Sequence, residues 1–151
     1  MTLPDQKTYA LMGGRLIDGL GQDPVMSSVV VVSAGRVVAA GRADTIAIPR
    51  DATKLDVAGL TVLPGIIDCH VHGTYRARDM RQHMLNAPTY NVLRSTSILD
   101  ETLACGVTTA RDMGGADAGF RQAIEEGYVV GPRLLIAIDR RGPTKIGRAH
   151  V

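Results

Sequence analysis

The sequence has few aromatic residues and few cysteines. Its 151 residues include no tryptophan, one phenylalanine, four tyrosines and two cysteines. An aromatic fraction of 3% excludes the stacking platforms with which proteins bind single-stranded nucleic acids. The two cysteines, Cys69 and Cys105, are too few for a disulfide framework or a cysteine metal cluster. Each lies in an apolar stretch, so we expect both to be small buried thiols.

Long apolar runs and an excess of charge of one sign are also missing. The longest apolar run in the opening segment, residues 29–32, is far shorter than the roughly 18 residues that suggest a membrane span. Residues 1–10 lack the apolar core of a signal peptide. With 17 basic and 15 acidic residues, the net charge of +2 creates no strong field for nucleic acid or anionic lipid. These absences predict a cytoplasmic protein without nucleic-acid or membrane partners.

The first 59 residues have the pattern of a small all-β segment. Short apolar runs alternate with Gly, Pro and Asp, which is typical of short antiparallel strands. The clearest hairpin joins residues 29–32 to residues 37–41, with Gly35 in the turn. Residues 9–12 and 15–17, around two glycines, predict a second pair of strands.

From residue 60 onward the pattern changes to strands that alternate with helices. Because this alternation is typical of parallel sheets with crossover helices, we expect an α/β fold. The first strand is almost continuously apolar, which predicts burial on both faces. A helix that begins at Ser97 and ends at Gly106, and another that ends at Gly127, would separate the strands. The strands are expected over residues 60–71, 107–111 and 133–138.

The most informative motif is Asp68-Cys69-His70-Val71-His72, at the end of the first of these strands. Side chains alternate along a strand, so His70 and His72 point the same way and could share one metal ion. The carboxyl end of a parallel strand is also where barrel enzymes build their sites. Asp68 lies on the same face, where it could accept a ring N–H and orient a ligand. A His-x-His pair without wider context is more often structural or exposed.

The wider context resembles the amidohydrolase superfamily of metal-dependent hydrolases. The resemblance is carried by residues 63–72, Leu-Pro-Gly-Ile-Ile-Asp-Cys-His-Val-His, and by residues 106–112, Gly-Val-Thr-Thr-Ala-Arg-Asp. Residues 127–135 look most like its prolidase-like and imidazolonepropionase-like branch. The resemblance implies a partial TIM (β/α)8 barrel, whose first three strands lie in residues 60–144. A small β-sandwich segment, residues 1–59, would precede it.

By this resemblance, His70 and His72 are the first ligands of a centre with one or two divalent metal ions, usually zinc. Such an ion polarises a carbonyl and lowers the pKa of its water to about 7. The implied function is hydrolysis of a C–N bond in a small-molecule substrate, an amide or cyclic amide, with an Xaa-Pro dipeptide as one candidate. A ring-amidine deaminase of the same superfamily and a non-catalytic scaffold relative stay open as alternatives. Homo-oligomer formation also stays open.

The family's remaining ligands are not found in this sequence. It takes a carboxylated lysine, two further histidines and an aspartate from later strands, whereas no other lysine or histidine here ends an apolar strand: Lys7, Lys54, Lys145, His83 and His150. We therefore expect an N-terminal fragment with no catalytic residue of its own, which is inactive alone and whose substrate-binding residues are unassigned. His83, expected in the long loop after the histidine pair, should be solvated or locally hydrogen-bonded, and Asp112 with Arg111 should anchor a loop or form a structural ion pair.

The last seven residues, 145–151, are predicted to be a non-native tail. Their sequence, Lys-Ile-Gly-Arg-Ala-His-Val, looks like a translated sequencing adapter. His150 is therefore not counted as a ligand.

Overall fold

The computed structural model describes residues 7–75 and 80–137, so the predicted tail at 145–151 lies outside the described residues. The chain is a mixed α/β protein that divides into two compact units, one up to Pro64 and one from Gly65 onward. In the described ranges, no helix is both long and apolar enough to cross a membrane.

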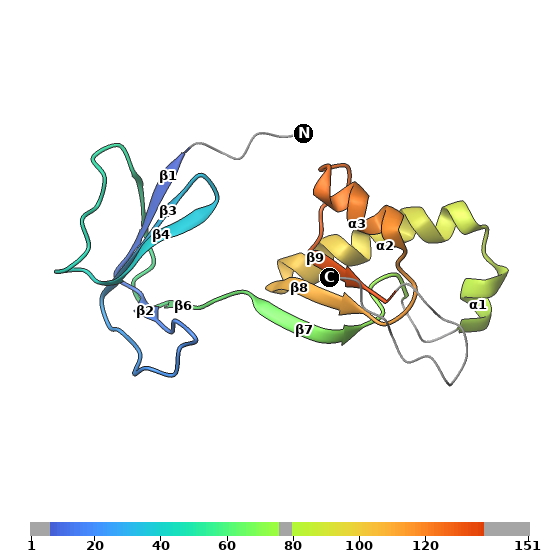
Figure 1. Cartoon of the computed structure of the whole chain (residues 1–151), viewed down its shortest axis with the longest axis horizontal. Helices are drawn as coiled ribbons and strands as arrows, with labels where there is room; N and C mark the ends of the chain where they lie inside the picture. The colour runs from blue at the N-terminus through green and yellow to red at the C-terminus, as the bar shows by residue number, and fades with distance from the viewer. Residues whose placement is uncertain (1–6, 76–79, 138–151) are drawn as a thin grey trace. The chain divides into compact units, whose positions relative to one another are not determined.

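The first unit consists of two small sheets (Figure 1). The larger sheet has the strand order β4-β3-β1-β5, and the smaller one pairs β2 with β6. The strands are β1 (Thr8–Met12), β2 (Arg15–Leu16), β3 (Ser28–Ser33), β4 (Arg36–Arg42), β5 (Thr53–Asp56) and β6 (Thr61–Val62).

The predicted hairpin is confirmed, because β3 and β4 are antiparallel neighbours with Val32 opposite Val37. The turn between them places Gly35 at a φ of 73°, in the left-handed region that favours glycine. The predicted second pair is wrong: β1 pairs with β3 and β5, and β2 pairs in parallel with β6. Both edges of β1 are already occupied by these neighbours, so β2 continues into the other sheet.

The second unit is a parallel three-stranded sheet with helices, in the order β7-β8-β9. Its strands are β7 (Ile66–Val71), β8 (Val107–Asp112) and β9 (Arg133–Ile136), and its helices are α1 (Met80–Leu85), α2 (Pro88–Ala104) and α3 (Ala118–Glu125). The expected alternation of strands and helices is confirmed, as is the parallel pairing. The helix α1 was not expected.

The core of this unit lies between the sheet and the two longer helices, α2 and α3 (Figure 1). Leu99 of α2 is 1% exposed, and it packs with Ala110 of β8 and with Leu134 and Ile136 of β9. Phe120 of α3 contacts the same cluster. The alternation of buried and exposed residues along β9 shows that its other face is turned away from the helices.

Two expectations about burial are wrong. The first strand of the sheet is not buried on both faces, since Ile66 and Ile67 of β7 are 50% and 67% exposed. Cys69 and Cys105 are exposed rather than buried. In the described part of the chain, β7 is an edge strand with β8 as its only neighbour, so fewer side chains cover it than its apolar sequence suggests.

The helix predicted to begin at Ser97 is wrong at its start, because α2 begins at Pro88. Ala87 occupies the N-cap without a side-chain hydrogen bond, and proline fits the first turn because that turn needs no N–H from it. Ser97 lies inside the helix, where its hydroxyl donates to the Arg94 carbonyl oxygen. The end of the helix was predicted well: Cys105 is its C-cap and Gly106 follows at a φ of 90°.

Candidate metal centre

The two histidines of the motif lie at the carboxyl end of β7. His70 is in the strand and His72 follows directly after it, both with exposed side chains. Their ring centroids are 5.6 Å apart, and the ring planes are inclined by 73°. Because zinc binds imidazole nitrogens at about 2.0–2.1 Å, two rings at this separation are near enough to contact one ion.

A hydrogen bond orients the ring of His72. Its Nδ1 lies 2.8 Å from the Gly114 carbonyl oxygen, in the loop after β8. A carbonyl oxygen only accepts, so Nδ1 is the nitrogen that carries the proton. In a neutral imidazole the other nitrogen, Nε2, then has a free lone pair for a metal ion. Imidazole donors of this kind suit zinc and other first-row divalent metals.

Asp68 contacts the pair through the main chain. Its carboxylate is half-buried, and Oδ1 accepts the backbone N–H of His70 at 3.0 Å. The sequence prediction gave it a ring N–H instead. Its orienting role stays a prediction. The contact that the structure shows is with the backbone of a candidate ligand, His70, and not with an imidazole ring.

Asp112, at the end of β8, is completely buried and serves as an anchor for two loops. Its Oδ2 accepts the N–H of Gly73 at 2.8 Å, and its Oδ1 accepts the N–H groups of Gly114 at 2.7 Å and Ala116 at 3.4 Å. Within the described residues it has no ion pair with Arg111. The loop-anchor interpretation is therefore confirmed.

An aromatic side chain extends the row of rings away from the histidine pair. The Tyr75 ring centroid is 6.0 Å from that of His72 and 4.6 Å from that of His83 in α1. The contact with His83 is edge-to-face, an arrangement favoured between aromatic rings. His83 is half-buried and lies in α1 rather than in the expected loop.

Among the described residues, no group of three or more histidine, cysteine, aspartate or glutamate side chains could hold a metal ion. Of the predicted ligands, the structure brings together only the pair His70 and His72 in the described residues. Sequence reasoning missed the contacts of Tyr75, and it missed the link from Asp112 through Gly114 to His72. The only signal for that link was the pair of glycines that begins two residues after Asp112.

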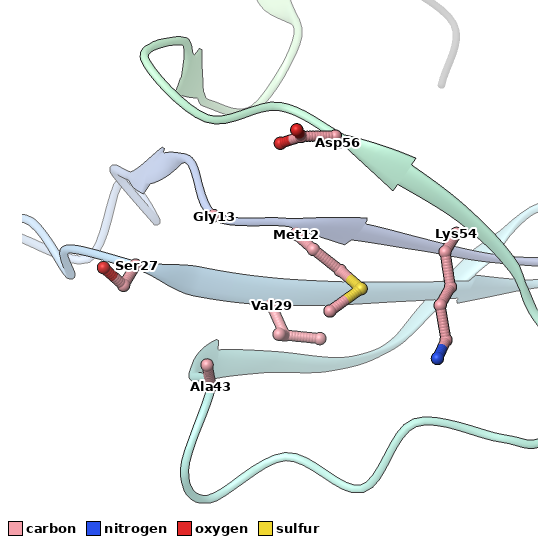
Figure 2. A pocket seen from close by; sticks show the side chains of 7 residues that line it. All are labelled: Met12, Gly13, Ser27, Val29, Ala43, Lys54 and Asp56. Atoms are coloured by element: carbon pink, nitrogen blue, oxygen red, sulfur yellow. The ribbon is translucent and has the colours of Figure 1, made fainter.

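A separate hollow lies in the first unit and has a volume of about 400 Å³. Figure 2 shows Met12 and Val29, with Lys54 beside them, pointing to the same side of the sheet. The full lining is Met12, Gly13, Ser27, Val29, Ala43, Lys54 and Asp56. The lining contains no histidine, and its one carboxylate, Asp56, accepts the backbone N–H of Ala58. The hollow thus lacks the donors of a metal site.

Known proteins resemble parts of this chain in sequence. Over 85 residues the chain is 33% identical to an enamidase from Eubacterium barkeri, which covers 54% of this chain and 22% of the relative. Over 71 residues it is 35% identical to an imidazolonepropionase from Stenotrophomonas maltophilia, covering 45% of this chain and 17% of the relative. The chain thus matches about a fifth of the length of these curated relatives.

Solved structures resemble a larger part of the chain. A prolidase complexed with N-methylphosphonate-L-proline has a TM-score of 0.77 and 34% identity, covering 88% of this chain and 32% of that chain. The ochratoxinase of A. niger has a TM-score of 0.72 and 26% identity, covering 87% and 31%. Such neighbours imply the TIM-barrel superfamily. The profile of the Amidohydrolase family matches residues 61–147, more than half of the sequence, and the chain belongs to the amidohydrolase family.

Proposed function

We propose that His70 and His72 are the first two metal ligands of a hydrolase that cleaves a C–N bond in a small molecule. The observation that carries this proposal is the pair of imidazoles, 5.6 Å apart at the carboxyl end of a parallel strand, in a member of the amidohydrolase family. The hydrogen bond from His72 Nδ1 to Gly114 supports it, because that bond leaves Nε2 as the ligand atom.

Two residues of this chain would hold the ion, and their neighbours would orient them. His72 would bind through Nε2 from a ring already fixed by Gly114, and His70 from a strand end whose backbone N–H is held by Asp68. When bound, one or two divalent ions, with zinc as the first candidate, supply a Lewis acid for the scissile carbonyl and lower the pKa of water. No proton-transfer role falls to a residue of this chain in the proposal.

The finer architecture belongs to the same proposal. Residues 1–59 would form the β-sandwich segment, residues 60–144 the first three strand–helix units of a (β/α)8 barrel, and residues 145–151 a non-native tail. The protein would act in the cytoplasm on a small-molecule substrate, and a homo-oligomer is compatible with this arrangement. The resemblance to solved structures over 88% of the chain supports the barrel assignment.

The names of the relatives favour an amide or cyclic amide as the substrate. A prolidase and an imidazolonepropionase are among them, so an Xaa-Pro dipeptide is the first substrate to test. In a longer protein that contains this chain, release of proline from such a dipeptide would support an amide hydrolase. Release of ammonia from a ring amidine would favour the deaminase alternative. A metal-loaded protein with neither activity would favour a scaffold.

The metal site itself is tested by adding zinc to the 151-residue chain. Two imidazoles are one fewer than the three protein ligands of the usual catalytic zinc, so we expect binding in the micromolar range or weaker. In equilibrium dialysis, His70→Ala and His72→Ala should each abolish this binding. His83→Ala is the matched control, because it also removes an imidazole but leaves the pair intact, and it should bind zinc as the unmodified chain does.

Zinc binding that survives both His70→Ala and His72→Ala would contradict the proposal, because it would place the ion elsewhere. Turnover of an Xaa-Pro dipeptide by the chain alone, lost on His72→Ala, would agree with the proposed ligand and contradict the expectation that the chain is inactive by itself.

A further inference from the structure

The loops that follow β7 and β8 are joined by a set of short hydrogen bonds around the candidate ligand His72. The Met113 N–H donates to the Val71 carbonyl at 2.9 Å, and the Gly73 N–H donates to Asp112 Oδ2 at 2.8 Å. The His72 ring donates in turn to the Gly114 carbonyl at 2.8 Å. The candidate ligand is thus held from the neighbouring strand.

Asp112 Oδ1 holds the peptide units on both sides of the one that His72 contacts. The Gly114 carbonyl belongs to the peptide unit between Gly114 and Gly115. The N–H of Gly114 lies in the preceding unit and the N–H of Ala116 in the following one, and Asp112 Oδ1 accepts both, at 2.7 and 3.4 Å. The direction of the carbonyl between them is therefore fixed by one buried carboxylate oxygen.

The loop has little room to adopt another arrangement. Gly115 has a φ of 127°, a conformation that favours glycine. A Cβ at this position would overlap Thr74 Oγ1 and lie 3.0 Å from the ring of Tyr75. The loop after β8 thus packs directly on the segment after β7, which leaves the Gly114 carbonyl in one position against His72.

We infer that Asp112 is the positioning residue for the metal ligand His72, acting through the backbone of Gly114. Its charged carboxylate makes stronger hydrogen bonds to backbone N–H groups than a neutral acceptor would. By aiming the Gly114 carbonyl at Nδ1, it selects the Nδ1–H tautomer and leaves the lone pair on Nε2. The importance of this tautomer for metal binding rests on the proposed function. The selection of the tautomer by Asp112 is independent of the proposed function.

The test determines the tautomer of His72 in the metal-free chain. It uses NMR spectra that correlate the ring nitrogens with their protons, recorded at a pH at which imidazole is neutral. We expect the Nδ1–H form in the unmodified chain. Asp112→Asn keeps the side-chain shape but replaces one acceptor oxygen by a donor that faces backbone N–H groups. The ratio of the Nδ1–H to the Nε2–H form should fall about fivefold, which corresponds to one ordinary hydrogen bond.

A matched control separates positioning from a general loss of stability. Leu134→Ala creates a cavity in the same core, and Leu134 lies in β9 rather than in either loop. The tautomer of His72 should be unchanged in this variant.

A second measurement needs no variant, in case Asp112→Asn does not fold. Couplings across hydrogen bonds should connect the Asp112 carboxylate to the amides of Gly73 and Gly114, and His72 Nδ1–H to the Gly114 carbonyl. Their absence would overturn the inference, as would an Nε2–H tautomer in the unmodified chain or an unchanged tautomer in Asp112→Asn. Because this measurement is made without metal, zinc binding that survives both His70→Ala and His72→Ala would contradict the proposed function and leave this result standing.

Discussion

Replacing Gly65 with alanine should destabilise the β7–β8 pair by a steric overlap. Gly65 directly precedes β7, and its φ is outside the positive region, so its backbone conformation does not require glycine. A Cβ there would overlap the Oγ1 and Cγ2 atoms of Thr108 in β8, and it would lie 2.6 Å from the Thr108 Cβ. Rotation of the threonine side chain moves the first two atoms but not the Cβ.

The overlap can therefore be relieved only by moving the backbone of β7 away from β8. Overpacking of this kind costs about 1–3 kcal/mol, and we expect the upper half of that range. The chain has no tryptophan, so unfolding in urea is best followed by circular dichroism, with amide hydrogen exchange of β7 and β8 to locate the effect.

A second substitution identifies the cause. Thr108→Gly removes the three atoms that the new methyl group would meet, so the loss caused by Gly65→Ala should shrink to near zero in the Thr108→Gly background. Gly119→Ala is the matched control, since its Cβ would meet only the exposed carboxylate of Asp117 at 3.1 Å. If Gly65→Ala costs the same in both backgrounds, the steric explanation is refuted.

Three further predictions concern stability. Asp117 caps α3 by accepting the N–H groups of Gly119 and Phe120, so Asp117→Ala should cost about 1 kcal/mol in urea unfolding, and no loss would show that the cap is dispensable. Leu134 is 2% exposed, so Leu134→Ala should cost about 2–5 kcal/mol, whereas a smaller loss would mean that the core collapses around the cavity. The hydrogen bond from Arg42 lowers the pKa of Asp44, so whatever the pair contributes to stability is present at neutral pH and is lost as pH falls through the folded-state pKa of Asp44. Both side chains are well exposed, so Asp44→Asn should leave the melting temperature at pH 7 unchanged within error, and a clear decrease would contradict a solvent-screened pair.

The parts of the site that depend on one strand could be predicted from the sequence. Residues two apart share a face of a strand, and this rule places His70 and His72 together without knowledge of any other element. The support of His72 by Gly114 could not be predicted in the same way. It depends on the register between β7 and β8, which shifts between Asp68 and Val71. The sequence contains no local signal for that irregularity.

The errors in the fold have similar causes. The apolar sequence of β7 indicates how much surface it could bury, but not which neighbours cover it, and the strand proved to be exposed. The sequence predicts the start of α2 at Ser97, nine residues after its actual start at Pro88, because serine is a favoured N-cap residue. The Ser97 hydroxyl instead donates within the helix, a use that the sequence pattern does not distinguish from capping.

The pairing of β1 with β5 bears on how the first unit folds. In the β3–β4 hairpin, the partners Val32 and Val37 are five positions apart, whereas Tyr9 of β1 and its partner Thr53 of β5 are 44 positions apart. Closing the longer loop costs about 2 kcal/mol more in chain entropy. The hairpin can therefore form early and locally, and β5, whose four residues are all exposed, must join the sheet by a slow search from a distance. The folding rate of this unit is then set by long-range strand pairing rather than by the hairpin.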